Sequence, residues 1–128
     1  MSIYNLLTGK PDYIGANGSN LTLMSCAEKQ LGLVFAEEYK EYLQNIGLAS
    51  YDGHELTGIC TSKRLNVVDV TLAARKTHPV PADWYVIEEA NIDDVVIWQA
   101  PNGTIYQSTP WSKPQQIANC FSDYVLSF

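Results

Sequence analysis

An amphipathic stretch that stops at a glycine is the feature that most constrains how this chain can fold. Five apolar residues recur in it at helical spacing, between charged and polar ones: Phe35, Tyr39, Tyr42, Leu43 and Ile46. This stripe predicts a helix with one buried face, which ends at Gly47 because glycine readily takes the left-handed conformation that follows a helix. Beyond it, residues 49–58 contain the turn pair Asp52-Gly53 and lead into a strand. The helix therefore needs a partner surface from the rest of the chain.

Stripes of the same period predict two more helices. The first begins after a capping residue, either Ser19 or Asn20, and ends at Gly32, so it forms a tight hairpin with the helix described above. The second includes Ile117 and runs to Phe128 at the end of the chain. Helical structure is therefore expected on both sides of the middle of the sequence.

The middle of the sequence is rich in β-forming residues. Five runs predict strands, at residues 56–60, 66–71, 84–89, 95–99 and 104–107. The pair Asn102-Gly103 favours a type I′ hairpin, so the last three strands should form an antiparallel meander. This order of elements predicts an α+β fold, in which an antiparallel sheet of about five strands packs with the N-terminal helical hairpin and a C-terminal helix.

Length and composition predict one globular domain. The chain has 128 residues, of which 46% are hydrophobic and 17% are charged. Residues 1–19 are rich in turn formers and predict an irregular arm, followed by a single domain over residues 20–128. There is no basic segment before an apolar run at the start and no apolar run long enough to span a membrane, so we expect a cytoplasmic protein. Its three widely spaced cysteines should be reduced thiols.

The charge balance narrows the class of partner. Fourteen acidic residues against eight basic ones give a formal net charge of −6. Nucleic acids and anionic membranes require clustered Lys and Arg, so neither is expected as a direct partner. The pairs Lys63-Arg64 and Arg75-Lys76 have no aromatic residues between them and read as solvated loops. A basic protein is the partner that fits best; the sequence leaves the oligomeric state open.

No motif for catalysis, metal binding or cofactor binding is present in the sequence. The cluster Asp52, His54 and Glu55 has the side chains for acid–base work or a metal ion, but a turn whose polar groups cap their own backbone is the favoured interpretation. Cys60 has the chemistry of a nucleophile, yet a cysteine in a strand is usually a small buried hydrophobe. We therefore predict a protein that is not an enzyme and that has no cofactor.

Two features are candidates for binding a partner. Five acidic residues and no basic one occur between residues 83 and 94: Asp83, Glu88, Glu89, Asp93 and Asp94. They should gather at one end or edge of the sheet, either to prevent edge-to-edge association or to steer a basic partner. Trp111 lies in a proline-flanked loop, where it either covers the core or is exposed as an interface residue.

Several segments, taken in order, resemble the SUKH superfamily, the Smi/Knr-type domain. They are LGLVFAEEYKEYLQNIG, SYDGHELTG, NVVDVT, PADWYVIEEANIDDVVIWQAPNGTIY and IANCFSDYVLSF, and the resemblance covers about residues 20–128. The family helix commonly opens with a proline directly after a leucine, in the pattern L-P-x-x-Y/F, whereas this chain has Ala36 after Phe35. That departure removes a preset backbone angle without removing the helix.

The resemblance implies a function as well as a fold. Bacterial proteins that resemble this chain are small cytosolic immunity proteins, which bind and neutralise a toxin domain, often a nuclease, of a polymorphic toxin system. Fungal members of the superfamily are longer regulators of cell-wall synthesis. The family has no shared catalytic residues. We therefore expect an immunity protein that occludes a cognate toxin, with a regulatory or scaffold domain for a non-toxin partner as the alternative. The predicted partner-binding residues are Glu88, Glu89, Asp93 and Asp94, followed by Asp52, Glu55 and Trp111.

Overall fold

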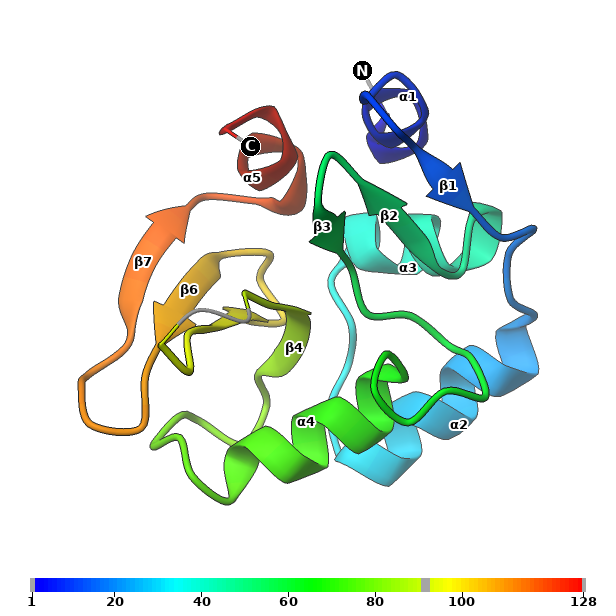
Figure 1. Cartoon of the computed structure of the whole chain (residues 1–128). Coiled ribbons are helices and arrows are strands. Elements are labelled where there is room, and N and C mark those ends of the chain that lie inside the picture. The colour runs from blue at the N-terminus through cyan, green and yellow to red at the C-terminus, as the bar shows by residue number, and fades with distance from the viewer. Residues whose placement is uncertain (1, 91–92, 128) are drawn as a thin grey trace.

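The computed structural model describes residues 2–90 and 93–127, and these residues form the predicted α+β arrangement (Figure 1). The helices in this part of the chain are α1 (Ile3–Thr8), α2 (Leu21–Leu31), α3 (Glu37–Asn45), α4 (Val67–Arg75) and α5 (Phe121–Ser127). The strands are β1 (Ile14–Gly15), β2 (Ala49–Tyr51), β3 (His54–Glu55), β4 (Tyr85–Glu89), β5 (Val96–Gln99), β6 (Ile105–Ser108) and β7 (Gln115–Ala118). In Figure 1, α1 and α5 lie side by side at one end of the molecule, and α2 and α4 pack together at the other.

The strands form two antiparallel sheets rather than the one sheet that was expected. The sheet orders are β1-β2-β3 and β4-β5-β6-β7. The segment after β3 links them through a bridge between Leu56 and Glu88 and a 2.8 Å hydrogen bond from Thr57 N–H to Ile87 O. The predicted meander of the last three predicted strands is confirmed as β4-β5-β6, and β7 extends it.

The type I′ turn predicted for Asn102-Gly103 is found instead at the other turn pair, Asp52-Gly53. Asp52 and Gly53 both have positive φ angles, 43° and 82°, as a type I′ hairpin requires. At the other pair only Gly103 has a positive φ, 101°, and its N–H bonds to Ala100 O across Pro101. The type I′ prediction for Asn102-Gly103 is therefore wrong: a proline at the first turn position favours an ordinary turn with one left-handed glycine after it.

The predicted helical hairpin is confirmed, with its caps. Asn20 Oδ1 accepts a 2.8 Å hydrogen bond from Leu23 N–H at the start of α2, and Gly32 ends that helix with φ 70°. After α3, Gly47 has the expected left-handed φ of 84° and donates to Tyr42 O. Both helices therefore end where the sequence pattern changes.

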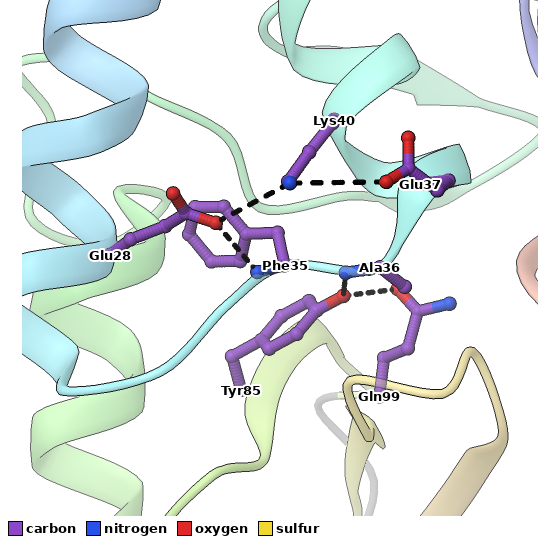
Figure 2. Close-up of polar contacts among 7 residues, drawn as sticks. All are labelled: Glu28, Phe35, Ala36, Glu37, Lys40, Tyr85 and Gln99. Carbon is purple, nitrogen blue, oxygen red and sulfur yellow. Dashed lines mark hydrogen bonds and ion pairs between the residues drawn. The ribbon is translucent and has the colours of Figure 1, made fainter.

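The start of α3 is capped from a distance, because its N-cap residue Ala36 has no side chain that can accept a hydrogen bond. Phe35 N–H donates to the Glu28 carboxylate on α2 at 2.8 Å. Ala36 N–H donates to the Tyr85 hydroxyl at 2.9 Å, and that hydroxyl donates to Gln99 Oε1 at 2.7 Å (Figure 2). One tyrosine thus joins the helical connection to β4 and β5.

Two further tyrosines attach α3 to the segment after β3. Tyr39 and Tyr42 are fully buried. The Tyr39 hydroxyl lies 2.8 Å from Thr57 Oγ1, which itself donates to Val86 O at 2.7 Å. The Tyr42 hydroxyl donates to Thr57 O at 2.7 Å and accepts from Ala49 N–H at 3.1 Å. Thr57 is therefore the point where α3 and β4 are connected through hydrogen bonds.

The segment predicted as a strand over residues 66–71 is instead the first half of helix α4. Its β-branched residues favour a strand locally, but Val67, Val70, Thr71 and Ala74 share one buried helical face. Thr71 Oγ1 accepts a 3.0 Å hydrogen bond from Val86 N–H, which docks the helix on β4. Tertiary packing therefore overrides the local preference.

Three other local predictions require correction. Residue 1 lies outside the described part of the chain, and residues 2–19 are not simply an irregular arm: Ser2 caps α1, which buries Ile3 and Leu7, and β1 pairs with β2. The division between that arm and a domain over residues 20–128 stays a prediction. Residues 56–60 form bridges and not a strand of their own. The C-terminal helix begins at Phe121, because residues 115–118 pair with β6 as strand β7.

We expect Tyr85→Phe to lower the free energy of unfolding by about 2 kcal/mol, because it leaves the buried Ala36 N–H and Gln99 amide without this hydroxyl. Urea denaturation measures the change. Tyr106→Phe is the matched control, since the Tyr106 hydroxyl has no hydrogen-bond partner among the described residues and should change stability by less than about 0.5 kcal/mol. Equal losses in the two variants would contradict the capping role of Tyr85.

Candidate functional site

The turn that contains Asp52, His54 and Glu55 was predicted as a weaker contact site or an acid–base cluster. Two of its three side chains form contacts within the protein. Asp52 is exposed at the tip of the β2–β3 hairpin. His54 stacks on Tyr51 with ring centroids 5.1 Å apart, and its Nδ1 lies 2.8 Å from Glu88 Oε2. Glu55 forms a two-pronged pair with Arg64, at 2.8 and 3.0 Å, which holds the pKa of the Glu55 carboxyl below its ordinary value. The three side chains therefore do not converge on one site.

Glu88 is buried and is not on the surface, so its prediction as a steering residue is wrong. Its side chain accepts a 2.6 Å hydrogen bond from the Tyr124 hydroxyl and meets His54 on the other oxygen. Burial, together with the Glu88 carboxylate, raises the pKa of the Tyr124 phenol. This carboxylate connects β3, β4 and α5, which explains why an acidic residue is kept in the core.

Three of the five predicted acids do come together, around a groove of about 640 Å³. Glu89 ends β4, and Asp93 and Asp94 lie just before β5; all three are exposed and line the groove. The two aspartates have positive φ angles of 52° and 57°, which aspartate tolerates better than most residues. Partial burial raises the pKa of Glu89, and the nearby Arg64 guanidinium acts in the opposite direction. Asp83 is exposed and does not line the groove.

The same groove is lined on its other side by the end of α4, and this part was missed by sequence analysis. Its lining residues there are Ala73, Ala74, Thr77 and His78. The His78 Nδ1 lies 2.9 Å from Ser108 Oγ, which also accepts a 2.8 Å hydrogen bond from Trp98 Nε1–H. Burial lowers the pKa of the His78 imidazole, and Asp94 acts in the opposite direction. Sequence analysis would have found this side of the groove only if residues 67–75 had been predicted as a helix.

Trp111 has 70% of its surface exposed, so the alternative in which it covers the core is wrong. It directly follows Pro110, which lines the groove on the side of β6. A tryptophan this exposed offers a large apolar and cation-binding surface to a partner. The predicted contact residues that are exposed near the groove are thus Glu89, Asp93, Asp94 and Trp111. Asp52 is exposed as well but does not line the groove.

The described part of the chain has little that would support catalysis. Within residues 2–90 and 93–127, no group of three or more His, Cys, Asp or Glu side chains is placed to hold a metal ion. Cys60 is half-buried in a loop rather than in a strand core, and its thiol contacts Ser62 O at 3.5 Å. No described helix is long and apolar enough to cross a membrane.

These features define a class of protein: a small α+β domain whose buried polar side chains connect its helices and strands. The family model described as SMI1-KNR4 cell-wall (SUKH_5) matches residues 8–127, which is nearly the whole chain. The chain therefore belongs to the SUKH family, as the resemblance predicted. Members of this family are commonly immunity proteins and are generally not enzymes. No curated protein matches the chain.

Truncation of the adjacent residues Glu88 and Glu89 should have very different effects on stability. We expect Glu88→Ala to lower the free energy of unfolding by about 3 kcal/mol, because Tyr124 and His54 lose a buried charged acceptor. Glu89→Ala is the matched control and should change it by less than about 0.5 kcal/mol, because the side chain is exposed. Chemical denaturation measures both, and a small effect of Glu88→Ala would contradict its structural role.

The His78 imidazole should make stability depend on pH. Its pKa in the folded state is lower than in the unfolded state, where it is about 6.5, so the unfolded chain takes up the proton first as pH falls. Stability should therefore decrease as pH falls below about 6.5 and level off below the folded-state pKa. Thermal denaturation from pH 7.5 to 5 measures this slope.

His78→Gln should flatten this part of the pH profile, whatever its effect on absolute stability. His54→Gln is the matched control because His54 is the only other histidine, and it should leave the contribution of His78 in place. An unchanged slope in His78→Gln would show that another group causes the loss.

Proposed function

We propose that this chain is an immunity protein that binds a cognate bacterial toxin domain of basic charge, such as a nuclease, and neutralises it by occlusion. Membership of the SUKH family supports this proposal, because immunity proteins are common in it. The net charge of −6 favours a basic partner and opposes direct binding to nucleic acid. The encounter would take place in the cytoplasm.

The observation that carries the proposal is the position of the exposed carboxylates of Glu89, Asp93 and Asp94 on a groove that is also lined by Pro110, the residue before the exposed Trp111. Acidic residues speed the encounter with a basic protein and orient it, whereas a central aromatic residue supplies most of the binding free energy. The two kinds of residue on one surface therefore suit a protein interface. The connected core beneath them would keep that surface rigid.

A regulatory or scaffold domain with a non-toxin partner is the second candidate. The cell-wall description of the matching family favours it. It requires the same kind of exposed surface, so the difference lies in the partner and not in the binding chemistry. An adjacent gene for a longer protein ending in a toxin-like domain would favour immunity, and a different neighbour would favour regulation.

We expect co-expression of this chain with the toxin domain of the neighbouring gene to restore bacterial growth and to yield a stable complex. Occlusion of the toxin accounts for both results. Growth curves and size-exclusion chromatography measure them. Failure to rescue, with both proteins expressed, would exclude the immunity function for that pair and favour the regulatory alternative.

The exposed indole provides the internal control for this experiment. Trp111→Ala should weaken the complex on the order of thirtyfold without affecting folding, because the side chain is a candidate hot spot and is not part of the core. Leu126→Ala is the matched control: Leu126 is 63% exposed, similar to Trp111, but lies on α5 and does not line the groove. Equal affinities of the two variants would remove Trp111 from the interface.

A further inference from the structure

The groove between α4 and β5 combines an apolar wall with an acidic rim. Small and apolar side chains supply the wall: Ala73, Ala74, Val95, Val96 and Pro110. The rim is formed by the carboxylates of Glu89, Asp93 and Asp94. A volume of about 640 Å³ falls in the range typical of ligand sites, about 300–1,000 Å³. It is therefore wide enough for a side chain together with its flanking backbone.

The charges around this groove are unbalanced. None of its described lining residues is Lys or Arg. The nearest base to Glu89, Arg64, is already held by Glu55, and the Arg75 guanidinium donates to the carbonyls of Leu31, Ala82 and Trp84. The C-terminal end of α4 also borders the groove, and a helix carries partial negative charge there. The groove therefore favours a cationic occupant.

The buried imidazole of His78 adds a donor to the carboxylates. Ser108 Oγ accepts from Trp98 Nε1–H and is almost fully buried, so its own proton is satisfied by donating to His78 Nδ1. The neutral imidazole then carries its proton on Nε2. This atom has no hydrogen-bond partner in residues 2–90 and 93–127 and is not among the fully enclosed polar atoms, although His78 is only 6% exposed. His78 is one of the residues that line the groove.

An N–H donor beside carboxylates is not what a free cation requires, because a cation takes acceptors only. A peptide segment with a basic side chain uses both kinds of group: its ammonium or guanidinium pairs with carboxylates, and its backbone carbonyl accepts from an N–H. The aliphatic stem of Lys or Arg can lie along the alanine and valine wall.

We infer that this groove binds a cationic segment of the partner polypeptide, with a Lys or Arg head among Asp93, Asp94 and Glu89 and a backbone carbonyl at His78 Nε2–H. The inference rests on the proposed function and deepens it, since it assigns the part of the partner that is recognised. Trp111, beside Pro110, would cover the segment from outside.

The test uses the full chain and a blocked pentapeptide, Ala-Arg-Ala-Lys-Ala, followed by NMR. We expect amide shift changes confined to residues 73–78, 89, 93–96 and 111, together with a shift of the His78 side-chain Nε2–H signal. The peptide Ala-Gln-Ala-Gln-Ala should bind at least about tenfold more weakly, because it has no charge to pair. Shift changes spread over all acidic residues, or equal binding of both peptides, would overturn the inference.

A matched pair of double variants separates the groove from net charge. Asp93→Asn/Asp94→Asn should weaken peptide binding about tenfold, since both carboxylates lose their charge. Asp12→Asn/Asp123→Asn makes the same charge change at two exposed aspartates that do not line the groove and are not among the predicted partner-binding residues. It should leave binding unchanged, and an equal loss would overturn the inference. So would tight binding of spermine without a shift of the His78 signal, because the groove would then bind cations without recognising a peptide.

The toxin domain of the neighbouring gene distinguishes failure of this inference from failure of the proposed function. If the unmodified chain restores growth and Asp93→Asn/Asp94→Asn associates as fast as Asp12→Asn/Asp123→Asn, immunity stands and the groove assignment is wrong. If the unmodified chain does not restore growth, the proposed function fails, and the peptide titration decides the groove independently.

Discussion

Three buried tyrosine hydroxyls hold the helical and strand halves of this molecule together. Tyr39, Tyr42 and Tyr85 are fully buried, and a hydroxyl group in such a place costs free energy unless it is hydrogen-bonded. Their partners lie on different segments: Thr57 after β3, Ala49 on β2, Ala36 before α3 and Gln99 on β5. Any shift of α3 along the sheets would break several of these bonds together. The same constraint extends to α4, because β4 contacts that helix through the bond from Val86 N–H to Thr71 Oγ1. The groove wall is thereby fixed relative to its acidic rim.

The acidic residues divide between the interior and the surface according to the pleat of β4. Neighbouring residues of a strand point to opposite faces, and the pairing of β4 with β5 shifts register between Val86 and Glu88. Glu88 consequently faces Tyr124 and His54 inside the molecule, while Glu89 faces the groove. Two chemically identical side chains thus serve different purposes, one in stability and one in the candidate interface. The number of charges along the sequence does not show which of the two glutamates is buried.

Periodicity predicted the elements whose buried face is continuous in sequence. Helices α2, α3 and α5 and strands β4, β5 and β6 were found in this way, with the capping roles of Asn20, Gly32 and Gly47. It failed for α4, where Val67, Val68, Val70 and Thr71 have the branched side chains of a strand but pack as a helix against β4 and α2. The short strands β1, β2, β3 and β7 were also missed as strands, because two to four residues give too little pattern. Of the predicted contact residues, Glu89, Asp93, Asp94 and Asp52 are exposed as expected, whereas Glu55 is half-buried and Glu88 is buried. Trp111, for which the sequence left burial and exposure open, is exposed.

By itself, the sequence determined the family, the α+β class and the acidic character of this protein. The first two depend on local motifs and hydrophobic periodicity, and the third is a sum of side-chain charges. The helix ending at Gly47 and the turn at Asp52-Gly53, where the chain changes from helical to extended structure, are the clearest examples. The tertiary structure alone decided which acids are accessible and that His78 and Asp94, far apart in sequence, line one groove. The physical reason is that solvent exposure and pKa depend on what packs around a group. Packing here brings α4, the β4–β5 connection and the segment after β6 together only in the folded chain.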